Sequence, residues 1–177
     1  MGYLEKKLQA IIMALDAWKL MTGNLYVMTS NTTPSPFVAS AYHNSPSFIY
    51  REPYQSLNNN TGDNYQASVN SGKYFGANLT FSKTVKIKTF TVSLTTNTYG
   101  SGGTVDYVID IKLPDNSFQE VYRSTRSQGT TLATDITLDT DDQVECIGIR
   151  HYVVWRTGDY TPCLLKKCQV TEWYEKG

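Results

Sequence analysis

The stretch that decides the fold class runs from Thr104 to Leu113 and reads TVDYVIDIKL. From Val105 and Tyr107 onward, the odd-numbered positions are apolar, whereas the even-numbered positions carry Asp, Asp and Lys, with Val108 as the exception. Alternation with a period of two is typical of an antiparallel strand that has one face in the core and one face toward solvent. The sequence therefore predicts a half-buried strand here.

The same alternation recurs on both sides of this strand. Phe90, Val92 and Leu94 form one run, and Ile87 is out of phase with it, which predicts a bulge near Lys88-Thr89. Further alternating runs cover Leu132–Leu138, Cys146–Trp155 and Leu164–Trp173. Turn residues separate these runs and no helical pattern lies between them, so the sequence predicts an all-β sandwich or barrel.

The N-terminal residues follow a helical period instead. Apolar side chains recur in steps of four and three residues, the spacing of a coiled-coil seam. This seam consists of Leu4, Leu8, Ile11, Leu15 and Trp18. It predicts an amphipathic helix from about Tyr3 to Met21, ended by Gly23-Asn24. Because so short a helix is unstable alone, we expect it to dock onto its own sandwich, onto another copy or onto a partner.

The chain therefore divides into residues 1–23, a docking or oligomerisation helix, and residues 24–177, a β-sandwich. Its 16 basic and 16 acidic side chains give a net charge of zero, which argues against binding to nucleic acid or to an anionic membrane. Gln9 and Asp16 interrupt the N-terminal apolar stretch, so we expect neither a signal peptide nor a membrane span. The three cysteines are an odd number without histidines at zinc spacing, which predicts buried, reduced thiols and folding in a reducing cytoplasm.

No catalytic motif is recognisable in the sequence. It contains no Gly-x-Ser-x-Gly elbow, phosphate-binding loop or His-Glu-x-x-His motif. Cys146 and His151 lie five residues apart in one predicted strand, so their side chains are expected on opposite faces rather than as a nucleophile pair. A carboxylate pair for sugar hydrolysis stays open. We predict that the protein is not an enzyme.

Four stretches, in their order and spacing, resemble the discoidin, or coagulation-factor type C, domain, one of the galactose-binding-like β-sandwiches. They are MTSNTTPSP with VAS (28–36 and 38–40), YQSLNNN (54–60), YFGANLTF with SKTVKI (74–87) and CIGIR (146–150). Such domains occur in carbohydrate-binding modules and in phage tail or baseplate proteins. The resemblance implies a jelly roll of about eight antiparallel strands, with ligands bound by loops at one end.

The resemblance also places the loop that follows Trp155 beside the ligand site. Exposed Trp and Tyr rings stack on the apolar face of a sugar, and Arg donates hydrogen bonds to its hydroxyls. The predicted ligand-binding side chains at this end are Trp155, Arg156, Tyr160, Tyr65, Tyr99 and Arg51. Two alternatives stay open: Trp155 closes the end of the core while Arg156 lies solvated at the rim, or these residues form a protein interface.

Members of this family often hold calcium near the loop that follows the first strand, through oxygen ligands. In the resemblance, the family's loop aspartate falls on Asn58 and its last-strand glutamate on Lys167, with Glu172 nearby. The loss of two carboxylates weakens such a site, to which Asn58 and Asp63 would still offer oxygens. We therefore expect no cofactor, with calcium at Asn58 and Asp63 as the weak alternative.

The helical seam beside a self-contained sandwich favours a non-catalytic structural protein of a phage virion, of decoration, fibre or baseplate type. Its partners would be other virion proteins, further copies of itself and a cell-surface glycan, without nucleic acid or membrane insertion. We expect synthesis in the host cytoplasm and residence in the virion. The alternative is a lectin-like carbohydrate-binding module, or an accessory binding domain of a carbohydrate-active system.

Overall fold

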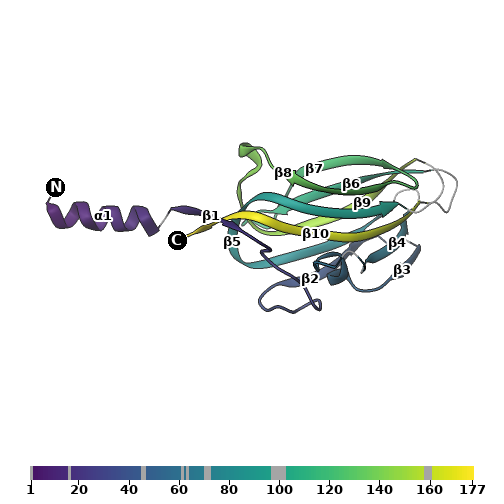
Figure 1. The fold of residues 1–177 in the computed structure, drawn as a ribbon, viewed down its shortest axis with the longest axis horizontal. Coiled ribbons are helices and arrows are strands. Elements are labelled where there is room, and N and C mark those ends of the chain that lie inside the picture. Colours follow the sequence, from purple (N-terminus) through teal and green to yellow (C-terminus); the bar gives the residue numbers. More distant parts are fainter. Residues whose placement is uncertain are drawn as a thin grey trace.

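The computed structural model describes residues 2–15, 17–44, 47–60, 62, 64–69, 73–96, 103–157 and 161–177. In these residues, ten antiparallel strands form a β-sandwich, and one helix, α1 (Tyr3–Leu15), projects from one end of it (Figure 1). The predicted all-β sandwich with an N-terminal helix is confirmed. No helix of the described residues is long and apolar enough to cross a membrane.

The first layer of the sandwich has the strand order β2–β5–β9–β6–β7. Its strands are β2 (Val38–His43), β5 (Tyr74–Thr96), β9 (Glu145–Thr157), β6 (Thr104–Lys112) and β7 (Phe118–Ser127). In this layer β5 pairs with β2 through Phe75–Thr80 and with β9 through Tyr74–Lys86, with a register shift between Thr80 and Val85. At this shift the long strand passes from the first layer toward the second.

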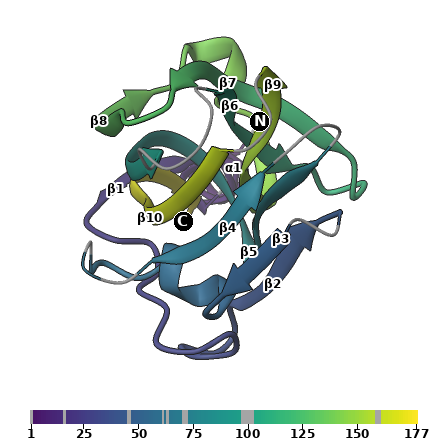
Figure 2. The same ribbon diagram turned by 90° about the vertical axis from the view of Figure 1, so that its right-hand side faces the viewer.

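The second layer has the order β8–β5–β10–β4–β3 and uses the later part of β5. Its other strands are β8 (Thr131–Thr137), β10 (Thr161–Lys176), β4 (Tyr65–Val69) and β3 (Ser47–Tyr50), with β1 (Trp18–Thr22) added to the end of β10. Short 3-10 helices occupy the connections, η1 (Pro53–Ser56) and η2 (Thr140–Asp142). Figure 2 looks onto the end of the sandwich that lies opposite α1.

The core lies between the two layers, and β5 contributes to it along its whole length. Val85 and Ile87 are buried, and so are Phe90, Val92 and Leu94 in the opposite phase. The change of phase coincides with register shifts against β10 on both sides of the pair Thr89–Glu172. The predicted bulge is confirmed, and it keeps apolar side chains inward on both sides of the shift.

The prediction that β6 is half-buried is wrong, because both of its faces are buried. Asp106 and Asp110 are only 1% and 2% exposed, although they lie on the face opposite Val105 and Tyr107. β6 is a central strand between β9 and β7, and arginine side chains of these neighbours cover its two carboxylates. The sequence pattern could not show this covering, because the arginines come from other strands.

The predicted helix is too long, since α1 ends at Leu15 and Trp18 belongs to β1. β1 pairs with the last residues of β10, from Trp18 opposite Lys176 to Thr22 opposite Glu172. The ammonium groups of Lys86 and Lys176 lie 4.7 and 5.4 Å from the centroid of the Trp18 ring. Pairing with a strand more than a hundred residues away in the sequence overrides the local helical period, so residues 18–22 lie in the sandwich and not in the helix.

Cys146 and His151 both face the core, contrary to the expectation of opposite faces. The irregular register between Thr80 and Val85 of β5 lies opposite this part of β9 and changes its phase. His151 Nε2 lies 2.9 Å from Ser56 Oγ and its Nδ1 lies 3.4 Å from the Tyr107 hydroxyl, which joins β9 to η1 and β6. Burial lowers the pKa of His151 to about 3, so the ring is neutral. All three cysteines are free and buried, as predicted.

Candidate functional site

The outer face of the first layer gathers polar and aromatic side chains from five strands. The antiparallel register places one row across β2, β5, β9 and β6, made of Ser40, Asn78, Arg150 and Asp110. The adjacent row consists of Val38, Thr80, Gly148, Lys112 and Phe118. Side chains that are distant in the sequence therefore become neighbours only through strand pairing.

Arg150 lies at the centre of this face. Its guanidinium carbon is 4.0 Å from the centroid of the Phe118 ring and 4.3 Å from that of the Tyr42 ring. In the strand order, β2 and β7 lie on opposite sides of β9, with β5 and β6 between, so the two rings come from opposite sides of the strand that carries Arg150. Asp110 Oδ2 accepts hydrogen bonds from Nε, at 2.8 Å, and from Nη2. Burial raises the pKa of Asp110, and the bond from Arg150 opposes this rise.

Three tyrosines extend the aromatic surface beyond Arg150. The Tyr42 and Tyr74 rings stack with centroids 4.6 Å apart, and Tyr152 meets Tyr42 edge-on at 5.1 Å. They pack above Gly76, where an added Cβ would collide with the His151 carbonyl oxygen and the Tyr152 side chain. Glycine is thus required at this close approach of β5 and β9, because it leaves room for the rings.

A groove of about 270 Å³ opens beside Arg150 on this face. We call it the outer-face groove, and its lining residues are Ser40, Tyr42, Asn78, Leu79, Thr80, Lys112, Phe118, Ile149 and Arg150. Gly148 faces Thr80 and Lys112 in the register, and a Cβ there would lie 2.5 Å from the Leu79 carbonyl oxygen. The missing side chain therefore leaves the hollow between β5 and β6. Phe118 is 38% exposed and supplies an apolar wall.

A second ionic cluster lies further along the same face. Asp106 Oδ2 is 2.7 Å from Arg123 Nη1 and 2.8 Å from Arg156 Nε, while Thr125 donates to its Oδ1 at 2.8 Å. Burial raises the pKa of Asp106, but these hydrogen bonds outweigh burial and hold the pKa below its ordinary value. Arg123 also pairs with Glu120. The cluster fixes Arg156 against the sheet.

The predicted loop-end site is not assembled in the described residues. Trp155 is half-buried against the core, which agrees with the alternative that it closes the core, and Arg156 lies on Asp106. Tyr65 was expected to bind ligand and is instead 2% exposed, because it packs on Phe75 at 4.3 Å between ring centroids. Arg51 is exposed in the connection between β3 and η1. Tyr99 and Tyr160 lie outside the described residues.

The expected calcium site is also only partly visible. Asn58 is 7% exposed, and its Oδ1 accepts a 2.9 Å hydrogen bond from the Asn60 backbone N–H. Asp63 lies outside the described residues. Among the residues that are described, no three His, Cys, Asp or Glu side chains cluster as metal ligands. Calcium at Asn58 and Asp63 therefore stays a prediction.

The docking role of the helix also stays a prediction. Leu4 and Leu8 of the predicted seam are 79% and 60% exposed, which leaves them available to a partner. The side chains of Ile11 and Leu15 lie outside the described set, and Trp18 is part of β1. The seam is therefore shorter than the sequence pattern predicts.

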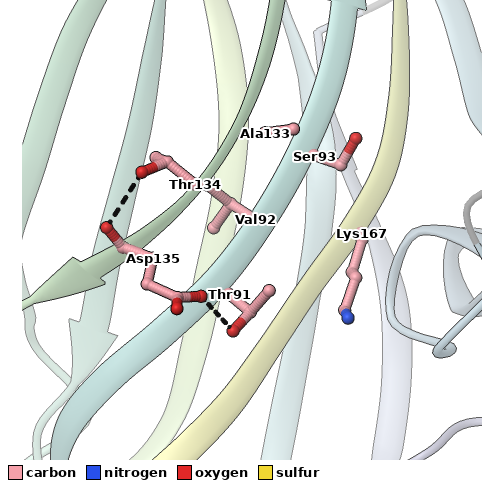
Figure 3. A pocket seen from close by; sticks show the side chains of 7 residues that line it. All are labelled: Thr91, Val92, Ser93, Ala133, Thr134, Asp135 and Lys167. Carbon is pink, nitrogen blue, oxygen red and sulfur yellow. Dashed lines mark hydrogen bonds between the residues drawn. The ribbon is translucent and has the colours of Figure 1, made fainter.

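Two other hollows are less suited to a specific ligand. One, of about 320 Å³, lies on the second layer between β8, β5 and β10 (Figure 3). There Thr91 donates a 2.5 Å hydrogen bond to Asp135, and Lys167 lies on the opposite side. None of the described residues that line this hollow is aromatic. The other, of about 440 Å³, is lined by Tyr54 and the loop residues 27–29 and 58–60, and borders positions that are not described.

Sequence reasoning missed Tyr42, Asn78, Lys112 and Phe118 as site residues. The sequence did contain one indication of this site, since Gly76 and Gly148 are isolated glycines within strands. An isolated glycine within a strand marks a close backbone approach or a gap in the side-chain layer. These glycines lie beneath the tyrosines and at the groove, respectively.

Comparisons with family profiles and with curated proteins give no match. Among solved structures, the chain is similar to the family 32 carbohydrate-binding module of C. perfringens NanJ, in complex with galactose, with a TM-score of 0.51 and 15% identity over 78% of this chain and 93% of that chain. For the family 32 module of AlyQ, in complex with 4,5-unsaturated mannuronic acid, the TM-score is 0.49 and the identity 14%, over 74% of this chain and 92% of that chain. For a truncated AlyQ with its family 32 module and alginate lyase domains, the TM-score is 0.48 and the identity 12%, over 91% of this chain and 34% of that chain. At these identities the likeness concerns the fold, and the chain has the discoidin-like, galactose-binding-like β-sandwich fold that its sequence resembles.

Proposed function

We propose that this chain is a carbohydrate-binding module and that the outer-face groove is its binding site. The observation that carries the proposal is the guanidinium of Arg150 packed against the Tyr42 and Phe118 rings beside a polar hollow. A sugar presents both apolar C–H surfaces and hydroxyls, so it requires apolar walls and directional hydrogen-bonding groups together. The groove offers both.

The polar groups of the groove match sugar hydroxyls in kind. Ser40 and Thr80 each offer a hydroxyl that donates and accepts, and the amide of Asn78 does both with separate atoms. The volume of about 270 Å³ is near the lower end of the range for small-molecule sites, about 300–1,000 Å³. The groove is therefore sized for one sugar unit, with the rest of a glycan outside it.

The groove is also preorganised. Asp110 holds one edge of the guanidinium and the two rings pack against it, so Arg150 loses little side-chain freedom when a ligand binds. A side chain ordered before binding spares about 0.5–1.5 kcal/mol of ordering cost. A rigid sheet face therefore supports a modest affinity for a small ligand.

The fold comparisons favour this function over a phage virion role. The similar structures include modules solved in complex with sugars, and the fold that this chain shares with them is compatible with the same kind of ligand. The proposed function is non-catalytic, because it requires recognition and no bond cleavage.

The test is a glycan array with the whole chain, followed by calorimetry with the best ligand. We expect Phe118→Ala to weaken binding about tenfold, which corresponds to about 1.4 kcal/mol. Leu20→Ala is the matched control, because Leu20 is 46% exposed on β1, away from the groove.

Tyr54→Ala tests the rival hollow in the loops. If Tyr54→Ala abolishes binding and Phe118→Ala leaves it unchanged, the groove is the wrong site. If the array stays silent for neutral and acidic glycans alike, the proposed function is wrong.

A further inference from the structure

We infer that the outer-face groove selects an acidic saccharide, one whose sugar ring carries a carboxylate. This inference rests on the proposed function and names the ligand class of the same site. Its basis is the charge balance around the groove and the direction of the hydrogen-bond donors that remain on Arg150.

The carboxylates of this face are already paired with arginines. Asp110 pairs with Arg150, Glu120 with Arg123, and Asp106 with both Arg123 and Arg156. Three carboxylates thus face three arginines. Among the described residues of this face, a further cation is Lys112, which lines the groove.

Lys112 has no carboxylate oxygen within 4.0 Å among the residues that the structure describes. Its side chain is half-buried in the groove wall. The groove therefore carries one surplus positive charge, which a neutral sugar leaves uncompensated and an anionic one neutralises.

Arg150 offers donors in the same hollow. A guanidinium has five N–H groups in one plane, and Asp110 Oδ2 accepts from Nε and from Nη2. The guanidinium packs against the Tyr42 and Phe118 rings, and its remaining N–H groups donate in its plane because the group is planar. Such an in-plane pair of donors matches the two oxygens of a carboxylate.

The register sets the spacing of these two cationic groups. Lys112 is directly opposite Gly148, and Arg150 is two residues further along β9, so the two are diagonal neighbours. Diagonal positions in an antiparallel pair are about 7–8 Å apart. Because Gly148 has no side chain, no side chain at position 148 separates Lys112 from Arg150. A carboxylate in the hollow contacts the ammonium of Lys112 and the donors of Arg150 together.

The experiment compares matched ligands with the native chain: a galacturonic acid trisaccharide and the corresponding neutral galactose trisaccharide, by calorimetry at two salt concentrations. We expect at least about tenfold tighter binding of the acidic ligand at low salt, with a preference that falls as salt rises. Lys112→Gln is expected to weaken the acidic ligand about tenfold and the neutral ligand much less, so that the preference for the acidic ligand is lost. Lys112→Arg is expected to retain the preference.

Lys19→Gln removes one positive charge from β1 and is the matched control, expected to change neither affinity. Thermal unfolding of each variant shows that it folds. Equal affinities for both ligands, unchanged in Lys112→Gln, would overturn the acidic preference and leave the carbohydrate-binding function intact. A sulfated galactose trisaccharide is measured as a third ligand, and tighter binding of it than of the galacturonic acid trisaccharide would overturn the carboxylate assignment. No binding of any glycan would overturn the proposed function itself.

Discussion

The Nε of Arg150 donates a 2.8 Å hydrogen bond to Oδ2 of Asp110, and this bond joins β9 to β6 across the outer face. The side chains are only 16% and 4% exposed, so both charges are largely removed from water. A charge removed from water depends on its partner, because its hydration has been lost. The pair therefore serves stability as well as the groove.

Arg150→Met is expected to lower the free energy of unfolding by about 3 kcal/mol at pH 7, because it leaves Asp110 buried and unpaired. Urea denaturation measures this loss. Lys83→Met is the control, since the pair of Lys83 with Glu175 is 45% and 26% exposed and is worth less than about 1 kcal/mol. Equal losses in the two variants would show that Asp110 does not depend on Arg150.

Acid is expected to destabilise the fold through His151. Its pKa is about 3 in the folded state against 6.5 for an ordinary histidine, so the unfolded chain binds the proton more readily. Stability is therefore complete above pH 6.5 and falls as the pH drops toward 3. Between pH 7 and pH 5 the expected loss is about 2 kcal/mol.

His151→Gln provides the comparison, because glutamine does not titrate in this range. The variant is expected to be less stable at pH 7 and to show a flatter pH dependence from pH 7 to pH 5. The measurement is urea denaturation at both values. Parallel pH curves for the variant and the native chain would show that His151 is not the group responsible.

The cysteines are expected to be unreactive in the folded protein. Burial raises the pKa of Cys146, Cys163 and Cys168 to about 12, and the thiolate is the reactive form. A chromogenic disulfide reagent should release no signal from the native chain at pH 8 and three equivalents in denaturant. Rapid reaction of even one thiol under native conditions would contradict the buried positions.

Gly148→Ala is expected to lower the free energy of unfolding by about 1–3 kcal/mol, because the new Cβ would lie 2.5 Å from the Leu79 carbonyl oxygen. The same methyl group would narrow the groove and weaken ligand binding. Gly2→Ala is the control, since its Cβ would meet nothing closer than 3.9 Å. Thermal unfolding distinguishes the two, and an unchanged melting temperature in Gly148→Ala would contradict the close approach.

Local patterns were sufficient to predict the strands β6, β8, β9 and β10 and the bulge of β5. The alternation around Val105 and Tyr107 depends only on neighbouring residues, and so does the phase change between Ile87 and Phe90. The end of the helix was not predictable in this way. Trp18 continues the apolar period, but its conformation is decided by pairing with Lys176 at the other end of the chain.

The groove could not be predicted from the sequence either, because it too depends on contacts between residues that are distant in the chain. Its residues come from β2, β5, β6, β7 and β9, and only the register brings Asn78 beside Arg150. The resemblance directed attention to the loops after Trp155 instead. Tyr65 illustrates the limit of composition, since a tyrosine suits a binding surface and a core equally well, and here it is in the core.

The passage of β5 through both layers has a mechanical consequence. One continuous backbone, Tyr74–Thr96, serves as an interior strand of each layer, so neither layer can detach while the other keeps all of its pairing partners. Loss of order at either end of this strand removes the interior strand of the layer to which that end belongs. The sandwich is thus tied into a single cooperative body by one covalent segment rather than by side-chain contacts alone.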